Sequence, residues 1–300
     1  MRRNFHAISK EHFDVAHICT SASLGLVRDL IVVNAARKHG VKTCIHMHFG
    51  RIPQIMGSCG WEKKLMIRLF NRVDRIVVMD MASYNALKDA GFEKMVYLPN
   101  PLSDEVIKFA EKYGELKREP RKIVYAGHVT ENKGVYELVK ACSQIHPIKL
   151  ELLGKCATPD IKYKLFDCIG KNNKEWLEIP GNKPFEDIIK VMMTCTLFVL
   201  PSYSEGLPNV ILASMACKCP IIATPVGAIP EMLDVGSDKP CGVCVPVKNV
   251  VALRNAIIEL IDNPKKAAEL SRNAKERVYG LYTMPKVWEQ LAEIWQTTVI

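Results

Sequence analysis

The chain has 300 residues, of which 48% are hydrophobic and 24% charged, a composition typical of a folded protein with room for two domains. No stretch reaches the roughly 20 apolar residues of a membrane-spanning helix, and the opening MRRNFHAISK is too polar for the core of a signal peptide. Without an export signal, the eleven cysteines predict free thiols. We therefore expect a cytoplasmic protein.

The net charge of +9 is unevenly distributed. Residues 1–118 carry 19 Lys and Arg against 12 Asp and Glu, whereas the remainder carries 22 against 20. A basic half attracts phosphate-rich partners, including an anionic membrane surface, a lipid pyrophosphate or nucleic acid. The basic residues lack interleaved aromatic residues and a recognition motif, so we expect no nucleic-acid partner.

Strands and helices alternate along the chain, which predicts an α/β protein with parallel sheets covered on both faces. Short runs rich in β-branched residues predict strands, and amphipathic stretches between them predict helices. The predicted strands are 15–18, 42–46, 75–79, 123–125, 150–153, 197–200 and 221–223. The predicted helices are 24–38, 62–71, 81–90, 135–145, 185–193, 209–216, 250–262, 265–279 and 287–295.

A polar segment interrupts this alternation and predicts a domain boundary. It runs from Leu102 to Pro120, just before a new strand begins at Lys122. We expect domains at 1–118 and 119–284. Pro285 should bend or restart the last helix, so 285–300 is predicted to be a helix that packs back toward the N-terminal domain.

The strongest motif is LPSYSEGLPNV at 200–210, where an apolar strand ends in a turn of small residues that opens a helix. Unpaired backbone amides and the positive end of the helix dipole then point beyond the end of the strand, where a diphosphate fits. Glu205 in the turn can accept hydrogen bonds from sugar hydroxyls. An acidic residue favoured by the helix dipole is an equally good interpretation of Glu205 alone.

A second motif, YAGHVTENKG at 125–134, again joins a strand to a helix through glycines and places Lys133 just before the helix. Lys133 could neutralise a phosphate as a point charge. Most lysines are simply solvated, so this motif gains its weight from its combination with the first.

Together with VGAIPE at 226–231, these segments resemble the retaining glycosyltransferases of family 4. The resemblance implies the GT-B fold, two Rossmann-like domains with parallel sheets facing a cleft. It implies a hexosyltransferase-type enzyme that moves a sugar from a nucleotide-diphosphate sugar to a glycan or lipid-linked acceptor in surface polysaccharide or glycoconjugate synthesis.

The resemblance also implies the roles of individual residues. Lys133 and His128 would hold the donor diphosphate, Glu205 would contact the donor sugar, and the amides of Gly206 and Leu207 would bind phosphate. His48, at the end of its strand, resembles the histidine near the donor sugar. The predicted catalytic residues are therefore His48, Lys133 and Glu205. The predicted donor-binding residues are Gly127, His128, Lys133, Ser202, Glu205, Gly206, Leu207, Pro208 and Asn209.

The sequence departs from the family pattern at three positions. The second glutamate of the family's Glu-x7-Glu motif, which contacts the ribose, falls at Ala213; His128 replaces an arginine; and Lys218 replaces a glycine. Losing a hydrogen bond to a charged acceptor costs about 1.5 to 3 kcal/mol. The alternative function is therefore a nucleotide-sugar-binding protein with impaired catalysis.

The N-terminal domain is expected to be incomplete. Residues 13–101, with FDVAHICTSAS at 13–23 and IHMHFG at 45–50, resemble the second half of the family's acceptor-side domain. The first strand of the family would lie centrally in this sheet, so its absence predicts an exposed sheet edge. We expect a reading frame that begins upstream; the alternative is a natural fragment that covers the exposed sheet edge by other means.

No metal and no cofactor are expected. The sequence contains no Asp-x-Asp site, and we expect His46 and His48 to face opposite sides of the sheet, without other ligands nearby. Cys241 and Cys244 resemble a metal or redox pair, but they fall where the family has an apolar strand after a glycine turn. Packing is the better interpretation of these cysteines.

The segment from Trp61 to Arg72 predicts an amphipathic helix. It places Trp61, Leu65 and Leu69 on one face and Lys64, Arg68 and Arg72 on another. A surface helix with a solvated basic face is the ordinary interpretation. Peripheral contact with the anionic inner face of a membrane is the alternative, since the family often uses lipid-linked acceptors.

Overall fold

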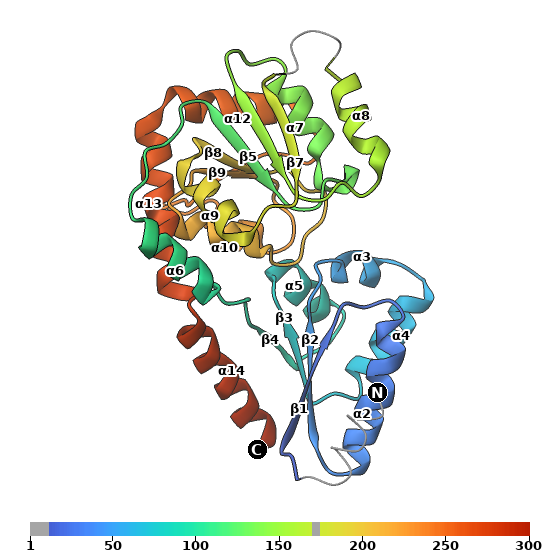
Figure 1. The fold of residues 1–300 in the computed structure, drawn as a ribbon. Helices are drawn as coiled ribbons and strands as arrows, with labels where there is room; N and C mark the ends of the chain where they lie inside the picture. The colour runs from blue at the N-terminus through green and yellow to red at the C-terminus, as the bar shows by residue number, and fades with distance from the viewer. Residues whose placement is uncertain (1–11, 170–174) are drawn as a thin grey trace. The chain divides into compact units, whose positions relative to one another are not determined.

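The chain folds into two compact units, each built on its own parallel sheet (Figure 1). The structure, a computed structural model, describes residues 12–169 and 175–300. The first unit contains the residues up to Asn100 together with Glu205–Leu207 and Pro285–Ile300; the second contains Pro101–Ser204 and Pro208–Met284. Among the described residues, no helix has the length and apolar character needed to span a membrane.

The division between the units falls at Asn100, earlier than the predicted boundary at residue 118. The polar segment predicted as a linker contains a helix, α6 (Asp104–Tyr113), whose N-cap Ser103 accepts a hydrogen bond from the amide of Glu105. α6 buries Val106 and packs against α9 (Phe185–Thr194) and α10 (Asn209–Ala216). Its exposed face is polar, which made the segment look like a linker in the sequence.

Four parallel strands form the sheet of the first unit, in the order β1, β2, β3 and β4. Helices α2 to α5 connect or follow these strands, and α14 completes the unit from the C-terminal end of the chain. The strands are β1 (Val15–Thr20), β2 (Lys42–Met47), β3 (Arg75–Val78) and β4 (Met95–Tyr97). The helices are α2 (Gly25–Lys38), α3 (Ile52–Gly57), α4 (Trp61–Phe70), α5 (Met81–Asp89) and α14 (Met284–Val299).

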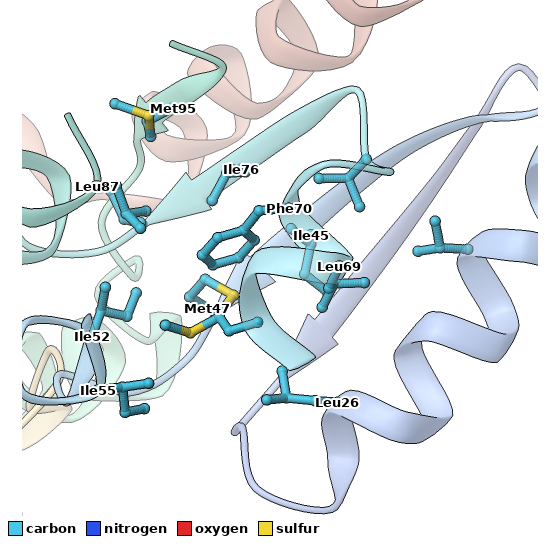
Figure 2. Close-up of a cluster of buried hydrophobic side chains, with 14 of the residues drawn as sticks. Leu26, Ile45, Met47, Ile52, Ile55, Leu69, Phe70, Ile76, Leu87 and Met95 are labelled. Atoms are coloured by element: carbon cyan, nitrogen blue, oxygen red, sulfur yellow. The ribbon is translucent and has the colours of Figure 1, made fainter. Parts of the chain in front are cut away.

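Different helices cover the two faces of this sheet, because successive strand side chains point to opposite faces. Ile45, Met47 and Ile76 enter a core cluster with side chains of α2 to α5, among them Leu26, Leu69 and Phe70 (Figure 2). The intervening residues Cys44 and Val77 pack instead against Val287 and Ile294 of α14. The C-terminal helix therefore covers one face of the first sheet.

Six parallel strands form the sheet of the second unit, in the order β10, β9, β8, β5, β6 and β7. Every residue of β5 and β8 is buried, so both faces of the middle of this sheet are covered. The strands are β5 (Lys122–Ala126), β6 (Lys149–Leu153), β7 (Leu177–Gly181), β8 (Leu197–Leu200), β9 (Ile221–Ala223) and β10 (Val243–Cys244). The remaining helices are η1 (Glu131–Lys133), α7 (Val135–Cys142), α8 (Pro159–Asp167), α11 (Ile229–Met232), α12 (Val250–Asp262) and α13 (Pro264–Leu281).

The predicted strands and helices are present, and the sequence missed mainly short elements. β4 and β10 span three and two residues, too few for a periodic pattern to appear. β7 alternates buried and exposed residues but includes Pro180 and Gly181, which weaken a strand pattern. The prediction that Pro285 restarts the helix is confirmed, since α13 ends at Leu281 and α14 begins at Met284.

Candidate functional site

The strand order of the second sheet marks one place on its edge. From β5 the chain moves outward to β6 and β7, whereas from β8 it moves outward the other way to β9 and β10. β5 and β8 are hydrogen-bonded neighbours, with Ile123 opposite Leu197. The loops that follow these two strands therefore leave in opposite directions and open a crevice at the carboxyl ends of the strands, where doubly wound sheets bind ligands. The two sequence motifs are these two loops.

The two loops are joined to each other. The amide of Tyr203, after β8, donates to the carbonyl oxygen of Asn132, after β5, at 2.9 Å. Gly134 has φ +67°, and a Cβ at this position would lie 2.0 Å from the carbonyl oxygen of Pro201. Only glycine allows this approach. Lys133 precedes Gly134 at the end of η1, so the contact between the loops fixes the backbone that carries the lysine.

The start of the β5 loop is held by the buried ring of Tyr125. The Tyr125 hydroxyl donates to the carbonyl oxygen of His128 at 2.7 Å. A Cβ at Gly127 would lie 2.9 Å from the same hydroxyl, and the φ of Gly127 is +153°. Gly127 and the side chain of His128 are exposed at this edge of the sheet. The His128 side chain can therefore approach an anion there.

The β8 loop ends at the N-terminus of α10. Ser202 is fully buried, and its carbonyl oxygen accepts a hydrogen bond from the Thr224 hydroxyl that follows β9. The N-cap of α10 is Pro208, which has no side-chain acceptor for the first helical amides. These amides and the exposed Asn209 stand at the positive end of the helix, a suitable place for a phosphate.

Three residues of the predicted donor set lie between these anchored parts of the β8 loop. Glu205 and Gly206 are partly exposed, and Leu207 is buried. They group with the first compact unit, whereas Ser204 and Pro208 on either side belong to the second. The structure thus gathers Gly127, His128, Lys133, Ser202, Pro208 and Asn209 at one edge of the second sheet and carries Glu205 to Leu207 on the connecting loop.

A cavity of about 340 Å³ opens beside the start of α10, within the second unit. Asn209 and Ala213, one helical turn apart, line it together with Gly127. The remaining lining is mostly apolar and comes from β5 and α10, together with α6, α9 and the segment before α6, three regions that the sequence did not associate with a site. These residues are Pro101, Leu102, Ser103, Val106, Ala126, Phe185, Ile188, Met192, Val210 and Leu212.

The two unusual residues of α10 have different structural settings. Ala213 faces the cavity, so a glutamate at this position would extend into it. Lys218 follows the C-terminus of the helix with φ +52°, in the left-handed region that favours glycine. The glycine of the resembling family would therefore relieve backbone strain at position 218.

His48 belongs to a group of aromatic side chains in the first unit. It directly follows β2, and its ring centroid lies 4.1 Å from that of His46. Nδ1 of His46 lies 3.2 Å from Nε2 of His17, on the neighbouring strand β1. The prediction that His46 and His48 face opposite sides of the sheet is wrong, because residues two apart in a strand share a face.

Burial determines the protonation of these histidines. Burial, with smaller contributions from the neighbouring His48 and His17, lowers the pKa of His46 to about 3. Burial also lowers the pKa of His17, with a smaller contribution from His48, and lowers the pKa of His48. The three imidazoles are therefore neutral near pH 7. His17 and Trp295 were not predicted, since nothing local in the sequence connects β1 with α14.

Donor atoms of His17, Cys19 and His46 lie within 4.8 Å of one another, the one such group in the described part of the chain. However, the indole Nε1–H of Trp295 donates to Nδ1 of His17 at 3.1 Å. A metal on Nε2 would require a proton on Nδ1, where it would oppose the indole N–H. Burial also raises the pKa of the Cys19 thiol, which disfavours the thiolate that binds metals. This geometry favours hydrogen-bonded imidazoles over a metal centre.

Two further segments singled out in the sequence have structural roles. Cys244 lies in β10, paired with β9, and burial raises the pKa of Cys241 and of Cys244 to about 11. In α4, Leu69 is fully buried and Leu65 packs against the core of the first unit, so neither offers an apolar surface to a membrane. Trp61 remains 54% exposed.

Comparison with known proteins identifies the class of this chain. Residues 107–277, more than half of the chain, match the family described as glycosyl transferases group 1. The chain therefore belongs to the group 1 glycosyltransferases. It has the GT-B fold: Anabaena HepE in complex with UDP matches 99% of this chain and 81% of that structure with a TM-score of 0.80 and 18% identity. Sucrose-phosphate synthase from Thermosynechococcus elongatus matches 97% of this chain and 75% of that structure, with a TM-score of 0.76 and 18% identity.

Relatives of known sequence point to sugar transfer in several settings. An uncharacterized glycosyltransferase of Methanocaldococcus jannaschii is 32% identical over 153 residues, 51% of this chain and 42% of the relative. A putative colanic acid biosynthesis glycosyltransferase of Salmonella typhimurium is 24% identical over 248 residues, covering 77% and 58%. The alpha-galactosylglucosyldiacylglycerol synthase of Streptococcus pneumoniae is 25% identical over 244 residues, covering 76% and 63%. The chain thus spans about half the length of these relatives.

Proposed function

We propose that this chain is a retaining glycosyltransferase that moves a sugar from a nucleotide-diphosphate sugar to a hydroxyl of a glycan or lipid-linked acceptor. The observation that carries the proposal is the junction of the β5 and β8 loops at the switch point of the second sheet. There, Lys133 and the N-terminus of α10 are held on loops that contact each other through Gly134 and Pro201. A lysine and the positive end of a helix together suit a diphosphate.

In this mechanism the bond between the anomeric carbon and the diphosphate oxygen breaks, and the acceptor oxygen bonds to the same face of that carbon. The proton of the acceptor hydroxyl leaves with the diphosphate. Lys133, His128 and the amides of Gly206 and Leu207 stabilise the negative charge on the leaving diphosphate, and preorganised charge of this kind is a large catalytic effect. Glu205 and His48 bind the donor sugar.

The leaving group needs no metal in this proposal, because the lysine and the amides of the loop supply the positive field that a divalent cation supplies in other transferases. Turnover should therefore persist in excess EDTA. Complete loss of turnover in EDTA, restored by Mg²⁺ or Mn²⁺, would contradict this part of the proposal.

Other proteins support the substrate class. The HepE structures contain UDP, UDP with glucose, and UDP-glucose. The names of relatives include a colanic acid biosynthesis enzyme and a glycolipid synthase. We infer that this chain acts in surface polysaccharide or glycoconjugate synthesis, with a nucleotide-sugar donor.

One observation favours a second function, a nucleotide-sugar-binding protein with little or no turnover. Ala213 removes a carboxylate from the cavity wall and leaves an apolar surface where the resembling family contacts the ribose. A binding protein would retain nucleotide affinity but show no transfer to any acceptor and no hydrolysis of the donor.

Calorimetric titration with UDP, GDP and ADP in the absence of metal tests the proposed donor site. One nucleotide should bind, and Lys133→Ala should weaken its binding about 10- to 150-fold, because a hydrogen bond to a charged group contributes about 1.5 to 3 kcal/mol. Lys162→Ala, an exposed lysine on α8, is the matched control. Equal affinities for the wild type and both variants would place the nucleotide elsewhere.

Turnover then separates the two functions. Release of nucleoside diphosphate that depends on an acceptor, with an α-linked donor giving an α-linked product, supports the retaining enzyme. Tight binding without acceptor-dependent release supports the binding protein.

A further inference from the structure

Three side chains from distant parts of the first unit form a chain of hydrogen bonds that leads to His48. The indole Nε1–H of Trp295, in α14, donates to Nδ1 of His17, and Nε2 of His17 lies 3.2 Å from Nδ1 of His46. An indole nitrogen can only donate, so Nδ1 of His17 must be the acceptor. In the neutral ring the proton of His17 is then on Nε2, and it is donated to Nδ1 of His46.

The same reasoning fixes the tautomer of His46. Because its Nδ1 accepts from His17, the neutral ring carries its proton on Nε2. Nε2 of His46 is buried and has no hydrogen-bond partner, and the whole residue is only 6% exposed. A buried donor without a partner is unfavourable, so apolar side chains in these positions would fold more easily. The arrangement therefore calls for a role beyond packing.

The chain of hydrogen bonds ends at His46, whose ring contacts the ring of His48. The rings of His46 and His48 are 4.1 Å apart and tilted by 39°, whereas the rings of His17 and His46 meet at 90°. The hydrogen bond from His17 fixes the orientation of the His46 ring. The His48 ring, which packs against the His46 ring, therefore contacts a surface of fixed orientation. His48 itself is exposed, and its one ring contact in the described part of the chain is with His46. Its orientation thus depends on the buried rings beneath it.

Building on the proposed function, we propose that Trp295, His17 and His46 are positioning residues that fix one tautomer and one ring orientation of His46, and so hold His48 in place for the donor sugar. Trp295 acts through the indole N–H, not through its bulk, because only the N–H selects the tautomer of His17. Trp288 on the same helix provides a comparison: its ring contacts that of Trp295 at 5.4 Å and is 55% exposed.

The test uses Trp295→Phe and the matched control Trp288→Phe in the full chain. Nitrogen-15 NMR of labelled histidines reports the tautomer of each ring. We expect single Nε2–H tautomers for His17 and His46 in the wild type and in Trp288→Phe, and mixed tautomers in Trp295→Phe. Wild-type tautomers in Trp295→Phe would overturn the proposal. This measurement decides the hydrogen-bond chain even if the protein lacks transferase activity, so its outcome is separate from that of the proposed function.

Kinetics test the positioning of His48. Trp295→Phe should lower kcat about 5- to 10-fold and leave the Kd for the nucleoside diphosphate within twofold, since that ligand binds the loops of the second unit. Trp288→Phe should keep the wild-type kcat. His46→Asn, whose amide oxygen can accept from His17, should retain more activity than His46→Leu. Equal kcat in both tryptophan variants, or equal loss in Asn and Leu, would contradict the positioning role.

Discussion

Acidification should destabilise the first unit mainly through His46. Its pKa is about 3 in the folded protein against 6.5 for the ordinary side chain. Below pH 6.5 the unfolded chain binds a proton at this position and the folded chain does not, so stability falls as the pH falls. At about pH 5, roughly 1.5 units below the ordinary pKa, the loss from His46 alone is about 2 kcal/mol relative to neutral pH.

Urea unfolding in a Trp176→Phe background measures this effect, because the remaining tryptophans, Trp61, Trp288 and Trp295, all belong to the first unit. Fluorescence then follows the first unit alone. Between about pH 7.5 and pH 5, His46→Asn should lose about 2 kcal/mol less stability than the wild type. His39→Asn, at an exposed histidine after α2, should match the wild type. If His46→Asn and the wild type lose the same amount, the neutral buried imidazole is not responsible for the acid sensitivity.

Three further predictions concern the second unit. Ala213→Glu should tighten binding of the nucleoside diphosphate about 10-fold or more, because it places a charged acceptor in the cavity. Calorimetry measures this affinity, and an unchanged value would mean that the ribose does not reach α10. Lys218→Gly should raise the free energy of unfolding by about 0.5 to 1 kcal/mol, because glycine adopts the left-handed backbone at φ +52° without strain. Thermal unfolding should then show a higher Tm. A lower Tm would contradict the idea that the backbone at Lys218 is strained. Gly134→Ala should abolish nucleotide binding, because its Cβ would lie 2.0 Å from the carbonyl oxygen of Pro201 and would push the two loops apart. The far-UV circular dichroism spectrum should stay that of the wild type. Wild-type affinity in this variant would show that the contact between the loops is dispensable.

The sequence predicted the second unit well because its signals are local. The strands β5 and β8 are short apolar runs, and each is followed within ten residues by a glycine-bearing loop and a helix. The rule that parallel strands end at one edge places both loops at the same edge of the sheet, whereas the pairing of β5 with β8 comes from the structure. The sequence could not show that Gly134 contacts Pro201, or that α6 helps to line the cavity, since both depend on packing between distant segments.

The histidine cluster of the first unit lay beyond the sequence for a different reason. His17 and Trp295 are 278 residues apart and meet only because α14 packs on the sheet that contains β1. Their hydrogen bond is one contact among many, and no periodicity marks it. The period of a strand does place His46 and His48 on one face, so their proximity was predictable from the sequence once that period was applied correctly.

The character of the cavity bears on the choice between an enzyme and a binding protein. Replacing a glutamate by alanine inside a polar site would leave buried groups without partners, each costing about 1 to 3 kcal/mol. Among the described residues, the buried side-chain atoms without partners lie elsewhere, and the cavity around Ala213 is lined by apolar side chains such as Leu102, Phe185 and Met192. Its wall therefore suits alanine without a stability penalty, as expected of a site that binds the nucleoside through apolar contact. In such a site the ribose hydroxyls would contribute little to affinity. Alanine at position 213 would then weaken recognition of the ribose without removing Lys133 and the start of α10, the groups proposed to hold the diphosphate.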